Sequence, residues 1–240
     1  MTHIVCSALL FDMDGVLIDS TPAVARVWAS WARERGFDPE EVVRKAHGRP
    51  SISTVRDYLP DGDHEAENII IEQREIDDMG GVVPLPGAFE LLSALPLDRW
   101  AIVTSCTRPL AEARLTAAGL PRPRTFVTST DVTHGKPSPE PYIKGAEILG
   151  FKPADCVVVE DAPAGIRAGK AAGSSVIGLR TMLRDSELQT LGADWLLDDC
   201  GGIKFESVAA GGLSLRLDTG DIDCCAPSLG EGCGTPRCGL

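Results

Sequence analysis

Short apolar segments separated by helical patterns are the feature that most constrains the fold of this chain. Each segment ends at turn or polar residues, as expected of buried strands; the six segments are 8–11, 100–104, 125–128, 156–159, 175–179 and 195–197. Strands that alternate with helices form βαβ units, which build a parallel sheet with helices on both faces. The sequence therefore predicts an α/β fold whose ligands bind beyond the carboxyl ends of the strands.

The interval between the first two segments is too long for one crossover connection. Residues from about 21 to 82 carry helical patterns and no strong strand, and the expected helices cover 22–35, 39–45, 51–59 and 65–79. Trp28 and Trp31 fall on the apolar face of the first helix, so we expect them in a core. We interpret the interval as an inserted helical module that acts as a lid, with hinges at 19–21 and 80–84.

Beyond residue 197 the pattern changes to that of a hairpin. Segments 206–210 and 213–217 flank Gly211-Gly212, a two-residue glycine turn. From 219 to 240 the chain is rich in Gly, Pro and Ser and holds four of the eight cysteines, without the C-x-x-C spacing of a zinc site. We expect this tail to be disordered.

Charge and hydropathy exclude several classes of partner. The 240 residues carry a formal net charge of −12, which argues against nucleic acid and anionic membrane surfaces as partners. No apolar run reaches the length of a membrane span, and the N-terminal residues lack the basic-then-apolar pattern of a signal peptide. We expect a cytoplasmic protein, and the sequence indicates no oligomeric state.

Two carboxylates, Asp12 and Asp14, directly follow the first apolar segment and precede Gly15, which allows a sharp turn. Carboxylates this close repel one another unless a cation lies between them or one of them holds a proton. The pair therefore indicates a Mg²⁺ site or an acid/base pair, and a solvated acidic turn is the alternative.

Three further polar features follow predicted strands or open the helix after one. They are Thr104-Ser105, Gly135-Lys136-Pro137 and Glu160-Asp161. Each alone has an ordinary explanation, such as a helix cap or a solvated lysine. A parallel sheet, however, brings all of them to the edge where Asp12 and Asp14 lie. Carboxylates at that edge suit Mg²⁺, and a lysine, a hydroxyl and helix N-terminal amides suit a phosphate.

These motifs resemble those of the haloacid-dehalogenase superfamily of aspartyl-phosphate enzymes, in the subfamily with a helical cap inserted after the first motif. The matching residues are Asp12-Met13-Asp14-Gly15-Val16, Val103-Thr104-Ser105, Gly135-Lys136-Pro137 and Glu160-Asp161-Ala162-Pro163-Ala164-Gly165-Ile166. A closer likeness to the glycerol-phosphate and 2-deoxyglucose-6-phosphate phosphatases rests on Trp100-Ala101, Thr107-Arg108, Pro139-Glu140-Pro141-Tyr142 and 160–173. The resemblance covers about 5–217 and implies a Rossmann-like catalytic core at 1–19 and 84–218 with a helical cap at 20–83.

The resemblance also implies a role for each motif residue. Asp12 is expected to be the nucleophile, and Asp14 is expected to be the general acid and base. Thr104 and Lys136 are expected to bind the phosphoryl oxygens, while Ser105 adds a hydrogen bond or caps a helix. The expected Mg²⁺ ligands are Asp12, Asp161, the backbone carbonyl of Asp14 and, directly or through water, Glu160.

The second aspartate separates reaction classes, because dehalogenases that resemble this family lack it. Asp14 therefore favours an alcohol leaving group, and the leading hypothesis is a Mg²⁺-dependent phosphatase of a small sugar or polyol phosphate. A sugar phosphomutase similar to β-phosphoglucomutase is the first alternative. Such a mutase places an arginine three residues after a cap glycine, whereas Arg49 here directly follows Gly48. A non-catalytic binding module with the same fold is the second alternative.

The cap loop at His47, Gly48 and Arg49 is predicted to recognise the leaving group, because loops carry specificity more often than regular elements do. A connecting turn with a solvated arginine is the alternative. The expected partner of the protein is a small phosphorylated metabolite.

Overall fold

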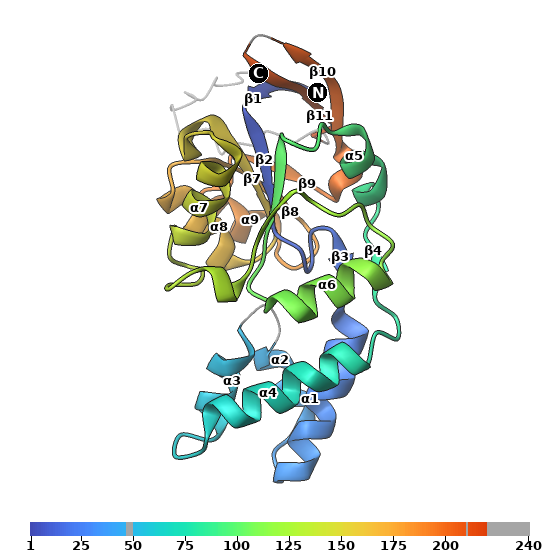
Figure 1. The fold of residues 1–240 in the computed structure, drawn as a ribbon, viewed down its shortest axis with the longest axis vertical. Coiled ribbons are helices and arrows are strands. Elements are labelled where there is room, and N and C mark those ends of the chain that lie inside the picture. The colour runs from blue at the N-terminus through green and yellow to red at the C-terminus, as the bar shows by residue number, and fades with distance from the viewer. Residues whose placement is uncertain (47–49, 210, 220–240) are drawn as a thin grey trace, which may run out of the picture.

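A six-stranded parallel sheet lies at the centre of the molecule. Residues 1–46, 50–209 and 211–219 are described by the computed structural model of the chain (Figure 1). The strand order is β6-β5-β2-β7-β8-β9, and each neighbouring pair is parallel. The strands are β2 (Ala8–Phe11), β5 (Trp100–Val103), β6 (Thr125–Val127), β7 (Cys156–Glu160), β8 (Ser175–Leu179) and β9 (Trp195–Leu197). The α/β fold and the six strands predicted from the apolar segments are confirmed.

Both faces of the sheet are buried, because alternate residues of each strand enter two different hydrophobic cores. Leu9 and Phe11 of β2 join one core, and Ala8 and Leu10 join the other. The helices on the first face are α5 (Ala88–Ala94) and α6 (Arg108–Ala117); those on the second are α7 (Glu140–Leu149), α8 (Pro163–Ala171) and α9 (Asp185–Thr190). Short 3-10 helices are η1 (Ser129–Asp131), η2 (Pro153–Asp155) and η3 (Cys200–Gly202). Among the described residues, no helix combines the length and the apolar character needed to cross a bilayer.

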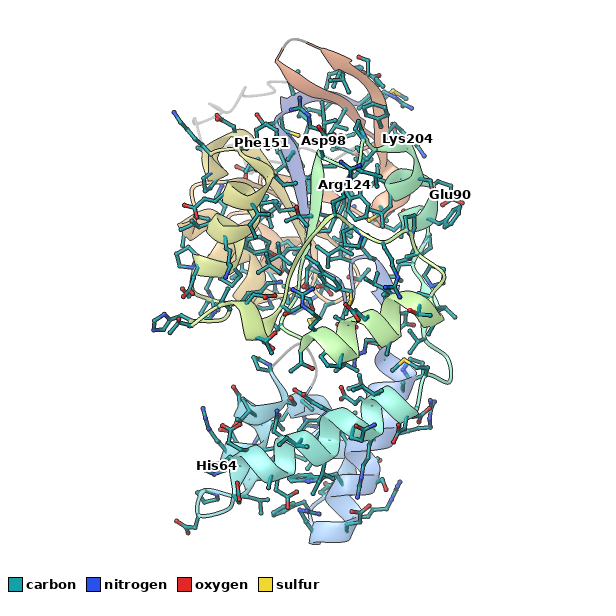
Figure 2. All side chains as sticks on the ribbon, in the orientation of Figure 1. His64, Glu90, Asp98, Arg124, Phe151 and Lys204 are labelled. Carbon is teal, nitrogen blue, oxygen red and sulfur yellow. The ribbon has the colours of Figure 1, made fainter. Side chains whose placement is uncertain are left out.

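Four helices between β3 and β4 form a second body, called the helical cap below. They are α1 (Thr21–Arg35), α2 (Pro39–Ala46), α3 (Ser51–Tyr58) and α4 (His64–Asp77). Trp28 and Trp31 are buried in a separate core of the cap, as predicted, and meet edge to face with ring centroids 5.5 Å apart. Figure 2 marks the cap by His64, far from Lys204 at the opposite end of the molecule.

The two segments that join the cap to the sheet lie side by side. β3 (Ile18–Asp19) pairs antiparallel with β4 (Val83–Pro84). Ile18 also forms a bridge with Asp14, and the Asp19 carboxylate accepts a hydrogen bond from the backbone amide of Thr21 at the start of α1. The connection to the cap therefore begins within the turn that carries the first motif.

A three-stranded antiparallel sheet, with the order β1-β11-β10, closes the end of the molecule away from the cap (Figure 1). Its strands are β1 (Thr2–Cys6), β10 (Ile203–Ala209) and β11 (Gly212–Leu217). The predicted hairpin is confirmed, although β10 begins earlier than expected and Gly212, predicted to lie in the turn, is the first residue of β11 and pairs with Ala209. The sequence did not indicate β1, because only Ser7 separates it from β2, although the chain bends at Ser7 and the two strands belong to different sheets.

Candidate active site

The turn after β2 places Asp12 at the carboxyl edge of the sheet. The Asp12 backbone amide donates to the carbonyl of Val159 in the neighbouring strand β7, over 3.0 Å. Gly15 has a φ of +80°, and a Cβ on it would lie 2.0 Å from Oδ2 of Asp161. Only glycine satisfies both conditions, so Gly15 allows the first motif to pack directly against the last one.

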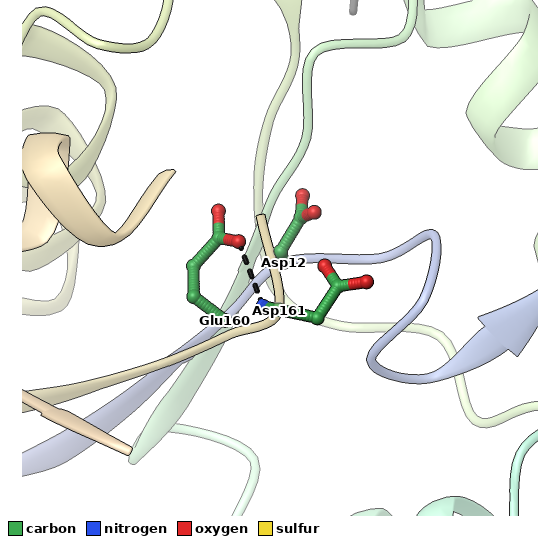
Figure 3. Close-up of side chains that lie close together, drawn as sticks. All are labelled: Asp12, Glu160 and Asp161. Atoms are coloured by element: carbon green, nitrogen blue, oxygen red, sulfur yellow. Dashed lines mark hydrogen bonds between the residues drawn. The ribbon is translucent and has the colours of Figure 1, made fainter. Parts of the chain in front are cut away.

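Three carboxylates form a buried cluster at this edge. Asp12, Glu160 and Asp161 each offer an oxygen, and these oxygens lie within 4.8 Å of one another (Figure 3). Burial raises the pKa of Asp12 to about 7 in spite of the neighbouring Lys136. Burial, followed by the charges of Glu160 and Asp12, raises the pKa of Asp161 well above its ordinary value. Oδ1 of Asp161 is buried without a hydrogen-bond partner. Hard oxygen donors with excess negative charge fit a Mg²⁺ ion.

Lys136 is the cation that balances part of this charge. Its Nζ donates to Oδ1 of Asp12 and to Oε1 of Glu160, each over 2.7 Å. Burial opposes the charged form, but the charges of Asp12 and Glu160 raise the pKa of Lys136 above its ordinary value. Lys136 is therefore a fixed positive charge against Asp12.

Glu160 is fully buried and has hydrogen-bond partners on both oxygens. Oε1 accepts from Lys136 and, over 2.8 Å, from the Tyr142 hydroxyl, while Oε2 accepts from the backbone amides of Asp161 and Ala162. Figure 3 shows the bond to the Asp161 amide. A Cβ on Gly165 would come within 1.5 Å of Oε1, so the start of α8 needs glycine there. The hydrogen bonds orient Glu160 toward Lys136.

The Asp14 side chain lies apart from the carboxylate cluster and has different partners. Oδ1 accepts from the Ser20 hydroxyl over 2.7 Å. Oδ2 accepts from the Arg114 guanidinium over 3.0 Å and from the Cys106 thiol over 3.3 Å. Arg114 also donates to Oε2 of Glu75, on cap helix α4, over 3.0 Å. The two aspartates of the first motif are therefore not equivalent.

One pocket collects the predicted residues of the sheet domain; they are Asp12, Asp14, Thr104, Ser105, Lys136, Glu160 and Asp161. Thr104 is buried, and its hydroxyl accepts a hydrogen bond from the amide of Cys106. The predicted cap residues His47, Gly48 and Arg49 lie outside the described residues, but Ala46 and Pro50 on either side of them line the pocket.

Several residues that shape the site were not identified from the sequence. Thr181 donates to the Gly15 carbonyl over 2.6 Å and to Oδ2 of Asp161 over 3.1 Å. Because Thr181 follows strand β8 at the same edge of the sheet, its position in the sequence could have identified it as a site residue. Ser20 occupies the N-cap position of α1, but its hydroxyl bonds to Asp14 and not to the helix. Arg114 and Glu75 lie within helices, where no motif marks them.

Comparisons with known proteins agree with this geometry. The family model described as haloacid dehalogenase-like hydrolase matches residues 6–173. Hexitol phosphatase A from Escherichia coli (strain K12) is 48% identical over 179 residues, which span 72% of this chain and 83% of that protein. Glycerol-1-phosphate phosphohydrolase 2 from Saccharomyces cerevisiae is 37% identical over 225 residues, which span 88% of each chain.

Similarity also extends to solved structures. A Bacteroides vulgatus protein assigned as a beta-phosphoglucomutase is 33% identical with a TM-score of 0.67, over 82% of this chain and 86% of that chain. The matches agree with the family and the branch that the motifs predict.

Proposed function

Because this chain belongs to the haloacid dehalogenase-like hydrolases, we propose that it is a Mg²⁺-dependent phosphatase of a small sugar or polyol phosphate monoester. One observation carries the proposal. The buried Asp12 carboxylate lies against Lys136 and next to Asp161, whose Oδ1 has no partner. In this proposal, Asp12 is the nucleophile, Lys136 is the cation for the phosphoryl group, and Oδ1 of Asp161 is an oxygen that can bind a metal ion. The named relatives that act on hexitol phosphate and glycerol 1-phosphate support the substrate class.

Asp12 performs the first step of the proposed reaction. Its carboxylate attacks phosphorus in line, the bond to the ester oxygen breaks, and an aspartyl-phosphate forms. Lys136, held by Glu160, offsets negative charge on Asp12 and on the transferred phosphoryl group. Thr104 lines the same edge and offers its hydroxyl to a phosphoryl oxygen.

Asp14 carries the proton in both halves of the reaction. It donates a proton to the departing alkoxide, which leaves as the free alcohol. The resulting carboxylate then removes a proton from the water that attacks the aspartyl-phosphate and releases inorganic phosphate. The contacts of Asp14 support this role, because its side chain lines the pocket outside the carboxylate cluster.

Asp12 and Asp161 are the side chains that would hold Mg²⁺, together with the backbone carbonyl of Asp14 that the family resemblance implies. When bound, the ion would offset the charge of the carboxylates and of the phosphoryl group. Glu160 belongs to the cluster, but both its oxygens already accept hydrogen bonds, which favours the role of orienting Lys136 over direct ligation.

The cap wall of the pocket suits a polyhydroxyl leaving group. Trp28 and Val24 give it apolar surface, and Glu72 gives it a hydrogen-bond acceptor that is itself oriented by Asn68 over 3.1 Å. Among the described cap residues that line the pocket, the charged ones are Glu72 and Glu75. Arg114 balances the charge of Glu75, so Glu72 is the carboxylate that disfavours a second phosphate, as would be present on a bisphosphate, and favours neutral hydroxyls.

A panel of phosphate esters tests the proposal. The purified protein with Mg²⁺ should hydrolyse sorbitol 6-phosphate, glycerol 1-phosphate or 2-deoxyglucose 6-phosphate with a higher kcat/KM than glycolytic bisphosphates. The products separate the mutase alternative, which shares Asp14 and has the structural neighbour described above. If glucose 1-phosphate were isomerised without release of inorganic phosphate, the phosphatase assignment would be wrong.

A further inference from the structure

A second cavity lies at the open edge of the six-stranded sheet, outside the active site. Strand β6 forms this edge, because among the described strands β5 is its only partner. The cavity has a volume of about 400 Å³, and its lining comes from α6, the segment before β6, β6 itself, η1 and α7. None of the described residues that line it also lines the active-site pocket. The cavity is therefore a separate place where a ligand could bind.

Positive side chains outnumber negative ones in the lining of this cavity. Its charged residues are Arg108, Arg122, Arg124, Lys144, Glu112 and Asp131. The lining thus has an excess of two positive charges, in a chain whose formal net charge is −12. Positive charge that gathers in one cavity of an acidic protein attracts anions to that cavity.

The carboxylate of Asp131 is already paired within the protein. Its Oδ2 accepts from Arg108 over 2.7 Å, and from the amide and the hydroxyl of Thr128 over 2.8 Å and 2.6 Å. Burial raises the pKa of Asp131, but the hydrogen bonds from Thr128 and the charge of Arg108 outweigh it and keep that pKa below its ordinary value. Arg108 and Asp131 form a closed pair, which leaves three cations against the exposed Glu112.

These three cations are Arg122, Arg124 and Lys144, and within the described part of the chain none of them has a carboxylate partner. Nη2 of Arg122 donates to the Thr116 hydroxyl over 3.3 Å, and Nζ of Lys144 donates to the backbone carbonyl of Asp131. Figure 2 labels Arg124 on the sheet domain. Both arginines are exposed and Lys144 is half-buried, so their remaining donors are accessible. Such groups bind phosphate and carboxylate oxygens.

Apolar side chains complete the lining. Leu115 is buried, Phe126 is half-buried, and Ile148 is 56% exposed. The Arg108 guanidinium lies 5.3 Å from the centroid of the Phe126 ring and keeps that ring in place. Sites for small organic ligands combine apolar walls with a few charged or polar groups, and they have volumes of this order. The cavity therefore suits an anion with a carbon skeleton better than a simple inorganic ion.

We propose that this cavity binds a small organic anion that carries two or more phosphate or carboxylate groups. Arg122, Arg124 and Lys144 bind the charged groups, and the carbon skeleton lies against Phe126 and Ile148. More than one negative group is needed, because a single one would leave most of the three cations without a partner. The proposed phosphatase reaction uses none of these residues, so the inference does not depend on it.

Two organic anions test the proposal and separate the two kinds of charged group. Fructose 1,6-bisphosphate carries phosphates, and citrate carries carboxylates. Isothermal titration calorimetry is done on the full-length, metal-free protein, in which the carboxylates of Asp12, Glu160 and Asp161 repel anions from the active site. At least one probe should bind saturably at one site per chain, and its affinity should fall as salt is added.

A pair of double variants locates the binding. Arg122→Gln with Arg124→Gln should raise the Kd by about 10- to 100-fold, because two charged donors are lost. Arg33→Gln with Arg167→Gln is the matched control, because it removes the same charge from two exposed arginines outside the cavity. The control should change the Kd by less than about twofold. With Mg²⁺ and without added anion, both variants should keep kcat/KM for sorbitol 6-phosphate within about twofold of wild type.

A second pair of variants probes the apolar side of the cavity. Ile148→Glu places a carboxylate beside the bound anion and should raise the Kd by about 10-fold or more. Leu97→Glu is its control, because Leu97 is also exposed, at 44%, and lies outside the cavity. The control should leave the Kd within about twofold of wild type.

The outcomes decide the proposal. Binding of the bisphosphate alone would support it with a phosphate ligand, and binding of citrate alone would support it with a carboxylate ligand. Absence of saturable binding of both probes up to about 10 mM would overturn it. Equal Kd values for the cavity variants and their controls would also overturn it, because the anion would then bind elsewhere. Inorganic phosphate that binds as tightly as the organic probes would contradict the role of the apolar wall.

Discussion

The two walls of the pocket hold their charged groups in different ways. On the sheet wall, Lys136 bonds over 2.7 Å to both Asp12 and Glu160, and the two acids lie at the ends of neighbouring parallel strands. On the cap wall, Glu72 and Glu75 lie on helix α4, and Glu75 accepts a hydrogen bond from Arg114 of the sheet domain. The proposed groups for phosphoryl transfer thus lie at one edge of the sheet, whereas the proposed contacts with the leaving group lie on a second body.

This difference predicts different consequences of mutation. Changes at the sheet edge should remove chemistry for every phosphate ester, because every ester presents the same phosphoryl group. Changes in the cap should affect esters unequally, because their leaving groups differ.

Asp12→Asn should have the largest effect. The amide is a poor nucleophile, so turnover of all esters should fall by about 10³-fold or more. The variant should stay folded, because the substitution is isosteric and removes a carboxylate whose ionisation is opposed by burial. Steady-state kinetics and a circular dichroism spectrum measure both effects. Wild-type turnover in the variant would contradict the assignment of Asp12 as nucleophile.

Removal of divalent metal should be nearly as severe. Chelation should abolish turnover, and added Mg²⁺ should restore it, because the carboxylate cluster has one lysine for its charge. Turnover that persists in metal-free protein would show that Lys136 alone is sufficient.

The cluster of Asp12, Glu160 and Asp161 predicts that the stability of the protein, and the gain in stability from Mg²⁺, both depend on pH. The pKa of Asp12 is raised to about 7, so the folded metal-free protein binds more protons than the unfolded chain below that pH. Its stability should therefore fall as the pH rises through the range from about 4 to 7. Mg²⁺ competes with these protons, and its effect on Tm should be larger at about pH 8 than at about pH 5. An equal shift of Tm at both pH values would contradict the metal site.

Tyr142→Phe should have a smaller effect on turnover. Phenylalanine keeps the ring, whose centroid lies 5.0 Å from Nζ of Lys136, and removes only the hydroxyl that donates to Glu160. We expect a loss of about 3- to 10-fold in kcat for every ester and of about 1 kcal/mol in stability. Unchanged kcat and unchanged stability together would show that Lys136 and the backbone amides orient Glu160 without the tyrosine.

The difference between the sheet wall and the cap wall also explains which site residues could be predicted from the sequence. Asp12, Thr104 and Asp161 follow apolar strands, and parallel topology alone brings such positions to one edge. Their assembly in one pocket was predictable for that reason.

The cap contacts could not be read in the same way. Arg114 lies within α6 and Glu75 lies in the last turn of α4, where a charged residue usually faces solvent, and the docking of α4 on α6 buries both. The strand β1 was missed for a different reason, since Ser7 alone separates it from β2 and no turn signal marks the change of sheet.

Leu215→Ala should have the smallest effect on turnover. Leu215 is fully buried in β11, in the antiparallel sheet at the end of the molecule away from the cap. Loss of its side chain should cost about 2–5 kcal/mol of stability, measured by denaturant unfolding. Below the unfolding transition, kcat/KM for alkyl and aryl esters should be unchanged. A selective loss on one ester would show that this distant sheet influences the cap.

Detection of the covalent intermediate would test the role of Asp12 directly. Acid quench during turnover of sorbitol 6-phosphate, followed by peptide mass spectrometry, should place a phosphoryl group on the peptide that contains Asp12, and hydroxylamine should remove it. The adduct should be missing in Asp12→Asn. Rapid turnover with the phosphoryl group on another residue would contradict the assignment of Asp12 as the nucleophile.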